Sequence, residues 1–311
     1  VDLHSYQPTA DDIMSISTCD MFIYVGGESD EWVEDALKEA TNKDMVVINL
    51  LEVLGDLVKE EEIVPGMQES EHEHEHEGEE ADEHEHEEEE ADEHEHEEEE
   101  ADEHEHEEEE ADEHEHEEGE ADEHEHEHEE GEAEYDEHVW LSLRNAAALT
   151  ESISKKLQGI DATNAGTYQA NSDAYIKQLN DLDQQYSDAV SEASVKTVLF
   201  GDRFPFRYLT DDYGLTYYAA FVGCSAETEA SFETIQFLAG KVDELSLHAV
   251  MTIEGADHRI AETIVQNTAA KDGQILTMDS MQSTTSKDVG DGVTYLSVME
   301  KNLSVLKEAL K

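Results

Sequence analysis

Histidine and glutamate alternate in one long acidic tract, and their side chains carry the most informative chemistry of the chain. The tract runs from Glu71 to Glu137, holds 14 of the 18 histidines and contains no Lys or Arg. From residue 81 a ten-residue unit, ADEHEHEEEE, recurs three times and then continues as ADEHEHEEGE and ADEHEHEHEE. Neutral imidazole and carboxylate suit divalent metals such as Zn²⁺. The tract is therefore predicted to bind metal ions at many weak, exchanging sites.

The alternative interpretation of this tract is a solvated acidic segment that serves only solubility. Histidine adds nothing to solubility, so its alternation with glutamate favours metal binding. The tract has almost no apolar residues and its charges repel one another, so we expect disorder in the absence of metal. Its ligands must be unprotonated, so uptake should fade as the pH falls through the histidine range near ~6.5.

Charge and cysteine content exclude several classes of protein. The net charge of −67 makes nucleic acid and anionic membranes poor partners and cations natural ones. The two cysteines, Cys19 and Cys224, are far apart and form no CxxC, which supports neither a disulfide framework nor a thiolate zinc site. No apolar run approaches the ~18 to 20 residues of a membrane span, and no signal peptide is evident. Because the chain opens at Val1 without Met, we expect an N-terminal segment, with any export signal, to be missing.

The segment before the tract alternates helical and strand patterns. Thr9 can cap a helix that ends at Cys19, and apolar strands are predicted at 21–25 and 45–50, with a helix at 29–40 between them. Two successive βα units predict a small parallel sheet covered by helices.

Two helices are predicted directly after the tract. The first is amphipathic and runs from about His138 to Gly159, and the second runs from about Ala162 to Ala193 with its apolar residues on one face. A helix of some 30 residues is about 45 Å long, which suggests a rigid backbone that joins two lobes.

The last part of the chain again alternates strands and helices. Short apolar strands are predicted at 196–200, 215–221, 249–254 and 274–279. The predicted fold is α/β, with two doubly wound lobes, a backbone helix between them and ligands bound beyond the carboxyl ends of the strands. The expected parts are a truncated N-terminal lobe (1–68), the disordered metal-binding loop (69–137), a helix completing the first lobe (138–161), the backbone helix (162–194) and the C-terminal lobe (195–311).

Four histidines lie outside the tract, and two of them are candidate ligands. His4 sits in a polar loop ahead of the first helix, and His138 opens the helix that leaves the tract. His258 and His248 are interpreted as surface or packed residues. A histidine near a helix start is more often solvated or capping, so spacing alone does not show whether either candidate binds a metal.

Acidic residues at strand ends form the second group of candidates. Asp279 closes one predicted strand, Asp202 follows another, and Glu254 ends a third. In a parallel α/β lobe these positions lie at the ligand-binding rim. The competing interpretation is a helix cap or a turn residue, which is common for Asp.

The chain resembles the metal-binding solute receptors of zinc and manganese ABC importers. The stretch VDLHSYQPTADDIMSISTCDMFIYVGG is similar to that family's G-x-D-x-H-x-Y/F-x-P-T loop with the helix and strand that follow, and DEHVWLSLRNA is similar to its D-P-H-x-W segment. The acidic His loop lies between these motifs, and DDYGL, CSAETEAS and the terminal helix extend the resemblance over nearly the whole chain. The family's first strand and helix are absent.

The resemblance implies a metal site between lobes. His4 and His138 match two imidazole ligands, and Asp279 matches a carboxylate that some members supply after a late strand. The third family position, a His or Glu, aligns with Arg203, which cannot ligate a metal, so the adjacent Asp202 is taken as its substitute. A ligand set of two His and two Asp is compatible with Mn²⁺ as well as with Zn²⁺.

The function implied is capture of one divalent metal, most naturally zinc, and its delivery to an ABC-type membrane permease. Such a receptor is expected to be an extracytoplasmic monomer, in the periplasm or on the cell surface as a lipoprotein. A metal-buffering protein that acts through residues 71–137 is one alternative, and a zinc hydrolase is another. The sequence lacks HExxH and GxSxG, so it is not predicted to be an enzyme.

Overall fold

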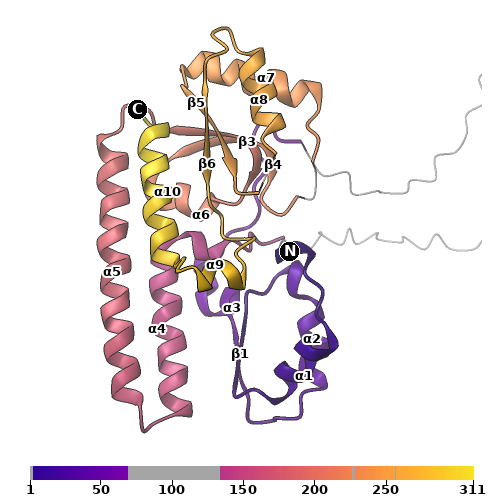
Figure 1. Cartoon of the computed structure of the whole chain (residues 1–311), viewed down its shortest axis with the longest axis vertical. Helices are drawn as coiled ribbons and strands as arrows, with labels where there is room; N and C mark the ends of the chain where they lie inside the picture. The colour runs from indigo at the N-terminus through magenta and orange to yellow at the C-terminus, as the bar shows by residue number, and fades with distance from the viewer. Residues whose placement is uncertain (1–2, 69–133, 226–227, 256) are drawn as a thin grey trace, which may run out of the picture. The chain divides into compact units, whose positions relative to one another are not determined.

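A computed structural model describes residues 3–68, 134–225, 228–255 and 257–311 (Figure 1). The described residues form one compact unit. The acidic His-rich tract, apart from its last residues, lies outside the described residues, and so do the predictions made for it. None of the helices in the described ranges has the length and apolar character needed to cross a lipid bilayer.

The N-terminal part contains the predicted βα units. Strands β1 (Met21–Tyr24) and β2 (Val46–Asn49) pair in parallel. Helix α1 (Ala10–Thr18) precedes β1, and Thr9 begins it with a capping box, as the sequence predicts. Between the strands lie a 3₁₀ turn, η2 (Glu28–Asp30), and helix α2 (Trp32–Lys38). The remaining short helical segments here are η1 (Leu3–Ser5), α3 (Leu50–Leu54) and η3 (Gly55–Leu57).

The C-terminal part is built on a parallel sheet of four strands in the order β4-β3-β5-β6. All three neighbouring pairs are parallel, which confirms the predicted α/β class. Apolar clusters cover both faces of this sheet: one includes residues of α5 and α10, and the other includes residues of α7 and α8. The elements are β3 (Thr197–Phe204), α6 (Arg207–Tyr213), β4 (Thr216–Val222), α7 (Phe232–Leu245), β5 (Ala249–Ile253), α8 (Arg259–Asn267), β6 (Gln274–Met278), α9 (Ser286–Gly290) and α10 (Tyr295–Ala309).

Strand β3 is longer than its apolar run predicts, because it continues through Asp202 and Arg203 to Phe204. Its register with β4 shifts between Phe200 and Arg203, an irregularity that locally disrupts the pairing of the two strands. Asp202 therefore lies within the strand rather than after it, which corrects the sequence interpretation.

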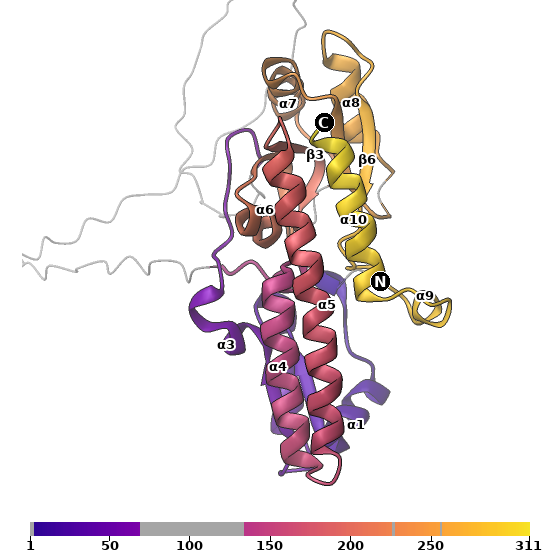
Figure 2. The same ribbon diagram turned by 90° about the vertical axis from the view of Figure 1, so that its left-hand side faces the viewer.

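Two long antiparallel helices connect the parts. Helix α4 (Leu143–Ile160) and helix α5 (Ala165–Glu192) lie side by side, and α5 also packs against α10, as Figures 1 and 2 show. With 28 residues, α5 is about 42 Å long, close to the predicted backbone helix. The predicted helix start at His138 is wrong, because Ser142 caps α4 and residues Val139–Leu141 form a 3₁₀ turn, η4.

Candidate metal centre

Two imidazoles that are 134 residues apart in the sequence meet in the structure. His4 lies in the N-terminal turn η1, and His138 immediately precedes η4. Their Nε2 atoms are 3.0 Å apart, and their ring centroids are 5.0 Å apart in an edge-to-face arrangement. The structure thus brings together the two histidines that the sequence singled out.

A carboxylate two residues upstream fixes the ring of His138. The Nδ1 atom of His138 is 2.9 Å from Oδ1 of Asp136, and the same oxygen accepts the backbone N–H of His138 at 2.8 Å. Both residues are buried, and His138 has no solvent exposure. Because an ionised carboxylate only accepts hydrogen bonds, this contact assigns the ring proton to Nδ1 and leaves the lone pair on Nε2.

Gly223 can lie against the His138 ring because it has no side chain. A Cβ atom at this glycine would lie 2.7 Å from Cε1 of His138 and 3.1 Å from the carbonyl oxygen of Phe204. The turn after β4 therefore packs directly against the edge of the imidazole.

The second imidazole is held in the same way by Glu137. Nδ1 of His4 is 3.3 Å from Oε2 of Glu137 and 2.8 Å from Oγ of Ser29. The other oxygen of Glu137 accepts the backbone N–H of Ser29 at 2.9 Å. Burial alone would raise the pKa of Glu137, but hydrogen bonds from His4 and Ser29 hold it below its usual value.

These contacts leave the two Nε2 nitrogens facing each other. With Nδ1 of each ring directed at a carboxylate, the Nε2 atoms of His4 and His138 lie 3.0 Å apart, close enough for one ring to hydrogen-bond to the other or for both to bind one cation. Two nitrogens that each lie 2.0–2.1 Å from a tetrahedral Zn²⁺ are about 3.3 Å apart. The pair is therefore shaped to bind a metal ion.

A cysteine completes this cluster, and the sequence interpretation missed it. One ligand atom from each of His4, His138 and Cys224 lies within 4.8 Å of the other two, and no other group of this kind occurs within the described residues. The sequence interpretation found no support for a thiolate zinc site, whereas the structure brings Cys224 close to both histidines. The available signal was its position just after an apolar strand, which places it at the carboxyl edge of the sheet.

Glu61 lies beside this cysteine. Burial raises the pKa of Glu61, hydrogen bonds from Cys224 oppose that effect, and Oε1 of Glu61 is buried without a hydrogen-bond partner. Burial, together with the charges of Glu61 and Glu137, raises the pKa of the Cys224 thiol far above its ordinary value. These residues line a polar cavity of about 280 Å³. Its lining consists of His4, Glu28, Ser29, Glu61, Glu134, Tyr135, Glu137 and Cys224.

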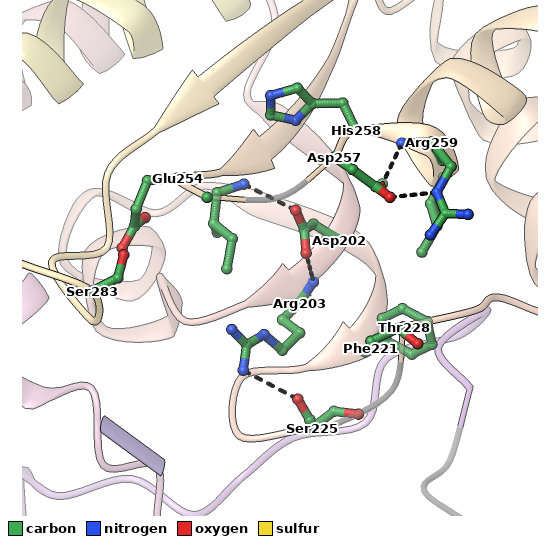
Figure 3. Close-up of a pocket in the computed structure, with 14 residues that line it drawn as sticks. Asp202, Arg203, Phe221, Ser225, Thr228, Glu254, Asp257, His258, Arg259 and Ser283 are labelled. Carbon is green, nitrogen blue, oxygen red and sulfur yellow. Dashed lines mark hydrogen bonds and ion pairs between the residues drawn. The ribbon is translucent and has the colours of Figure 1, made fainter. Parts of the chain in front are cut away.

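The structure places Asp202 in a separate pocket, outside the cluster with His4 (Figure 3). Its carboxylate accepts the backbone N–H groups of Arg203 at 2.9 Å and Ile253 at 3.2 Å. Burial raises the pKa of Asp202, and these two hydrogen bonds oppose the rise. The guanidinium of Arg203 donates to the carbonyl oxygen of Ser225 at 3.3 Å.

Asp279 and Glu254 also bond to the backbone near their strand ends. Asp279 accepts the N–H of Met281 at 2.9 Å, and its own N–H donates to Asn302. Glu254 accepts the backbone N–H groups of Ser280 and Gln282. Neither carboxylate belongs to the histidine cluster. The ligand roles of Asp202 and Asp279 stay predictions.

The remaining two histidines lie away from the cluster. Nε2 of His248 is 2.7 Å from the carbonyl oxygen of Glu308, which fits the expected packing role. His258 lines the same pocket as Asp202, and its Nδ1 atom is buried without a hydrogen-bond partner.

Known proteins share this fold. The chain superposes on the Zn(II)-bound ZnuA-like domain of *Streptococcus pneumoniae* AdcA with a TM-score of 0.62 at 23% identity, covering 100% of this chain and 87% of that one. It superposes on the metal-dependent lipoprotein YcdH of *Bacillus subtilis* with a TM-score of 0.66 at 21% identity, covering 100% and 87%. At these identities the similarity establishes the fold.

Sequence comparison identifies relatives that are longer than this chain. The chain is 27% identical over 307 residues to the zinc-binding lipoprotein AdcA of *Streptococcus pneumoniae* R6, which covers 98% of this chain and 48% of that protein. It is 30% identical over 176 residues to the high-affinity zinc uptake system protein ZnuA of *Bacillus subtilis*, covering 56% of this chain and 53% of that one. The chain thus spans about half the length of these relatives.

The described residues combine a parallel α/β fold with two paired imidazoles. The family model described as "Zinc-uptake complex component A periplasmic" (ZnuA) matches residues 1–309. The chain belongs to this family, which is one of receptors rather than enzymes.

Proposed function

We propose that this chain captures one Zn²⁺ ion at the His4–His138 pair and delivers it to the membrane permease of an ABC importer. The receptor acts outside the cytoplasm as a monomer. The acidic His-rich tract serves as a lower-affinity reservoir that collects cations for the site. The bound metal is cargo, and no catalytic step is involved.

The observation that carries this proposal is the approach of two Nε2 atoms to 3.0 Å while both Nδ1 atoms face carboxylates. A carboxylate behind each imidazole orients the ring and raises its basicity as a metal ligand. Membership of the ZnuA family and the zinc-binding names of the relatives support zinc as the cargo.

Calorimetric titration of the full chain with Zn²⁺ in the presence of a competing chelator tests this function. The chelator suppresses the weak sites of the tract, so one stoichiometric tight site should remain. We expect His4→Ala and His138→Ala each to abolish it, whereas His248→Ala, which changes a histidine bonded to Glu308, should leave it intact.

Two results would overturn or redirect the proposal. A tight site that persists in both His4→Ala and His138→Ala would refute the assignment. Tight binding that depends only on the histidines of residues 71–137 would instead favour the metal-buffering alternative. A parallel titration with Mn²⁺ decides between the two cargo metals.

A further inference from the structure

Cys224 is held against the imidazole pair by the turn after β4 (Thr216–Val222). The N–H of Ser225 donates to the carbonyl oxygen of Val222 at 3.3 Å, and Gly223 packs on the edge of the His138 ring. The backbone on both sides of the cysteine is thus fixed relative to His138. The thiol is free of any disulfide and partly exposed, so a metal ion can reach it.

The surroundings of this thiol differ from those of a cysteine that merely packs. A structural cysteine behaves as a small hydrophobe among apolar neighbours. The cavity at Cys224 is instead lined by the imidazole of His4 and by several carboxylates, and the buried Oε1 atom of Glu61 has no hydrogen-bond partner. A sulfur atom within 4.8 Å of two imidazole nitrogens in such a cavity has the geometry of a metal ligand.

We propose that Cys224 is the third protein ligand of the site and that its thiolate makes the site selective for zinc over manganese. This inference rests on the proposed function and names the residue that sets its metal preference. Thiolate sulfur favours Zn²⁺, whereas Mn²⁺ prefers oxygen ligands. Two imidazoles and one thiolate form a softer ligand set than the two His and two Asp expected from the sequence. That harder set was compatible with Mn²⁺ as well as Zn²⁺.

Glu61 lines the same cavity as Cys224, and its buried Oε1 atom has no hydrogen-bond partner. The structure therefore assigns Cys224 to the metal.

Cobalt substitution of the full chain tests the proposal with a signal that only a thiolate produces. Co²⁺ bound through sulfur gives a ligand-to-metal charge-transfer absorption in the near ultraviolet, whereas Co²⁺ bound by the His and Glu side chains of the tract does not. We expect this absorption at one equivalent of Co²⁺ in the parent chain, its loss in Cys224→Ser and Cys224→Ala, and its retention in Cys19→Ser. Cys19 is the matched control because it is the other free cysteine of the chain.

Zinc and manganese titrations of the same variants measure selectivity. Cys224→Ser should weaken Zn²⁺ binding at least about tenfold while changing Mn²⁺ binding much less, so the ratio of the two affinities falls. Circular dichroism of Cys224→Ala and Cys224→Ser identifies a variant that fails to fold, and the cobalt spectra of the parent chain and of Cys19→Ser then decide.

The outcomes separate this inference from the proposed function. Absence of the charge-transfer absorption in the parent chain, or its persistence in Cys224→Ser, overturns the role of Cys224. If tight zinc binding is nevertheless lost in His4→Ala and His138→Ala, the proposed receptor function stands without a ligand role for Cys224. If those histidine variants still bind zinc tightly, the proposed function itself fails.

Discussion

Two regions of this molecule carry the same side-chain types and use them in opposite ways. Around His138 the carboxylates of Asp136 and Glu137 bond to imidazole nitrogens, which directs the Nε2 atoms of both rings at each other. In the pocket of Figure 3 the carboxylate of Asp202 instead accepts two backbone N–H groups, from Arg203 in β3 and Ile253 in β5. Both regions lie where parallel strands end, the usual place for a ligand.

The difference teaches that ligand identity depends on which atoms remain available after the local hydrogen bonds are made. A histidine and a carboxylate in one pocket do not define a metal site. An imidazole whose Nδ1 is already bonded presents one defined donor atom, whereas a carboxylate that accepts backbone amides must break those bonds to bind a metal.

The largest expected effect on zinc affinity comes from adding a side-chain atom beside the His138 ring, in the first region. Gly223→Ala places a Cβ 2.7 Å from the His138 ring, against a backbone carbonyl that cannot yield easily, so the imidazole must move. We expect zinc affinity to fall about 100-fold or more and stability to fall by about 1–3 kcal/mol. Zinc titration and urea unfolding measure the two effects.

Gly240→Ala is the control for this change. Gly240 lies in α7 with open space around its Cβ position, so alanine there should stabilise the helix by about 0.5–1 kcal/mol and leave zinc binding unchanged. Unchanged affinity in Gly223→Ala would mean that the position of the His138 ring does not govern binding.

The next effect comes from the orienting carboxylates. Asp136→Asn keeps the shape of the side chain but lets its amide group turn toward His138, which permits the wrong tautomer. We expect zinc affinity to fall by about 10- to 100-fold, the usual cost of removing a carboxylate behind a metal-bound histidine. The measurement is chelator competition, and an affinity equal to that of the parent chain would contradict the orienting role.

A smaller effect is expected at the hydroxyl that ties the two chain segments of the site together. Tyr208 is buried, its hydroxyl donates to the carbonyl oxygen of Asp136 at 2.8 Å, and it accepts the N–H of Lys59 at 3.0 Å. Tyr208→Phe leaves both backbone groups without this partner, so stability should fall by about 1–3 kcal/mol in urea unfolding. Zinc affinity should change less than in Asp136→Asn; a stability equal to the parent would show that water replaces the hydroxyl.

The smallest effect on zinc is expected in the second region. Asp202→Asn and Asp279→Asn change carboxylates that lie outside the histidine cluster, so zinc affinity should shift by less than about threefold, well under 1.4 kcal/mol. A loss of about 100-fold in either variant would instead support the ligand role predicted from the sequence and remove the contrast between the two regions.

Local patterns were sufficient for most of the fold. The capping box at Thr9, the apolar runs of β1 and β5 and the one-sided helix α5 appear where alternation and helical periodicity place them. These signals are local, because backbone geometry and the burial of one face act over a few residues. The start of α4 and the length of β3 were misjudged, because a cap at Ser142 and a register shift against β4 override the apolar pattern.

For the site, the sequence offered His4 and His138 as two of the four histidines outside the tract, and the resemblance of their motifs to the receptor family selected them. Only the tertiary structure decided that Cys224 joins them and that Asp202 lies in a different pocket. The physical reason is that membership of a site depends on contacts between residues more than 80 positions apart. Those contacts follow from strand order and the packing of turns, which no local pattern of residues encodes.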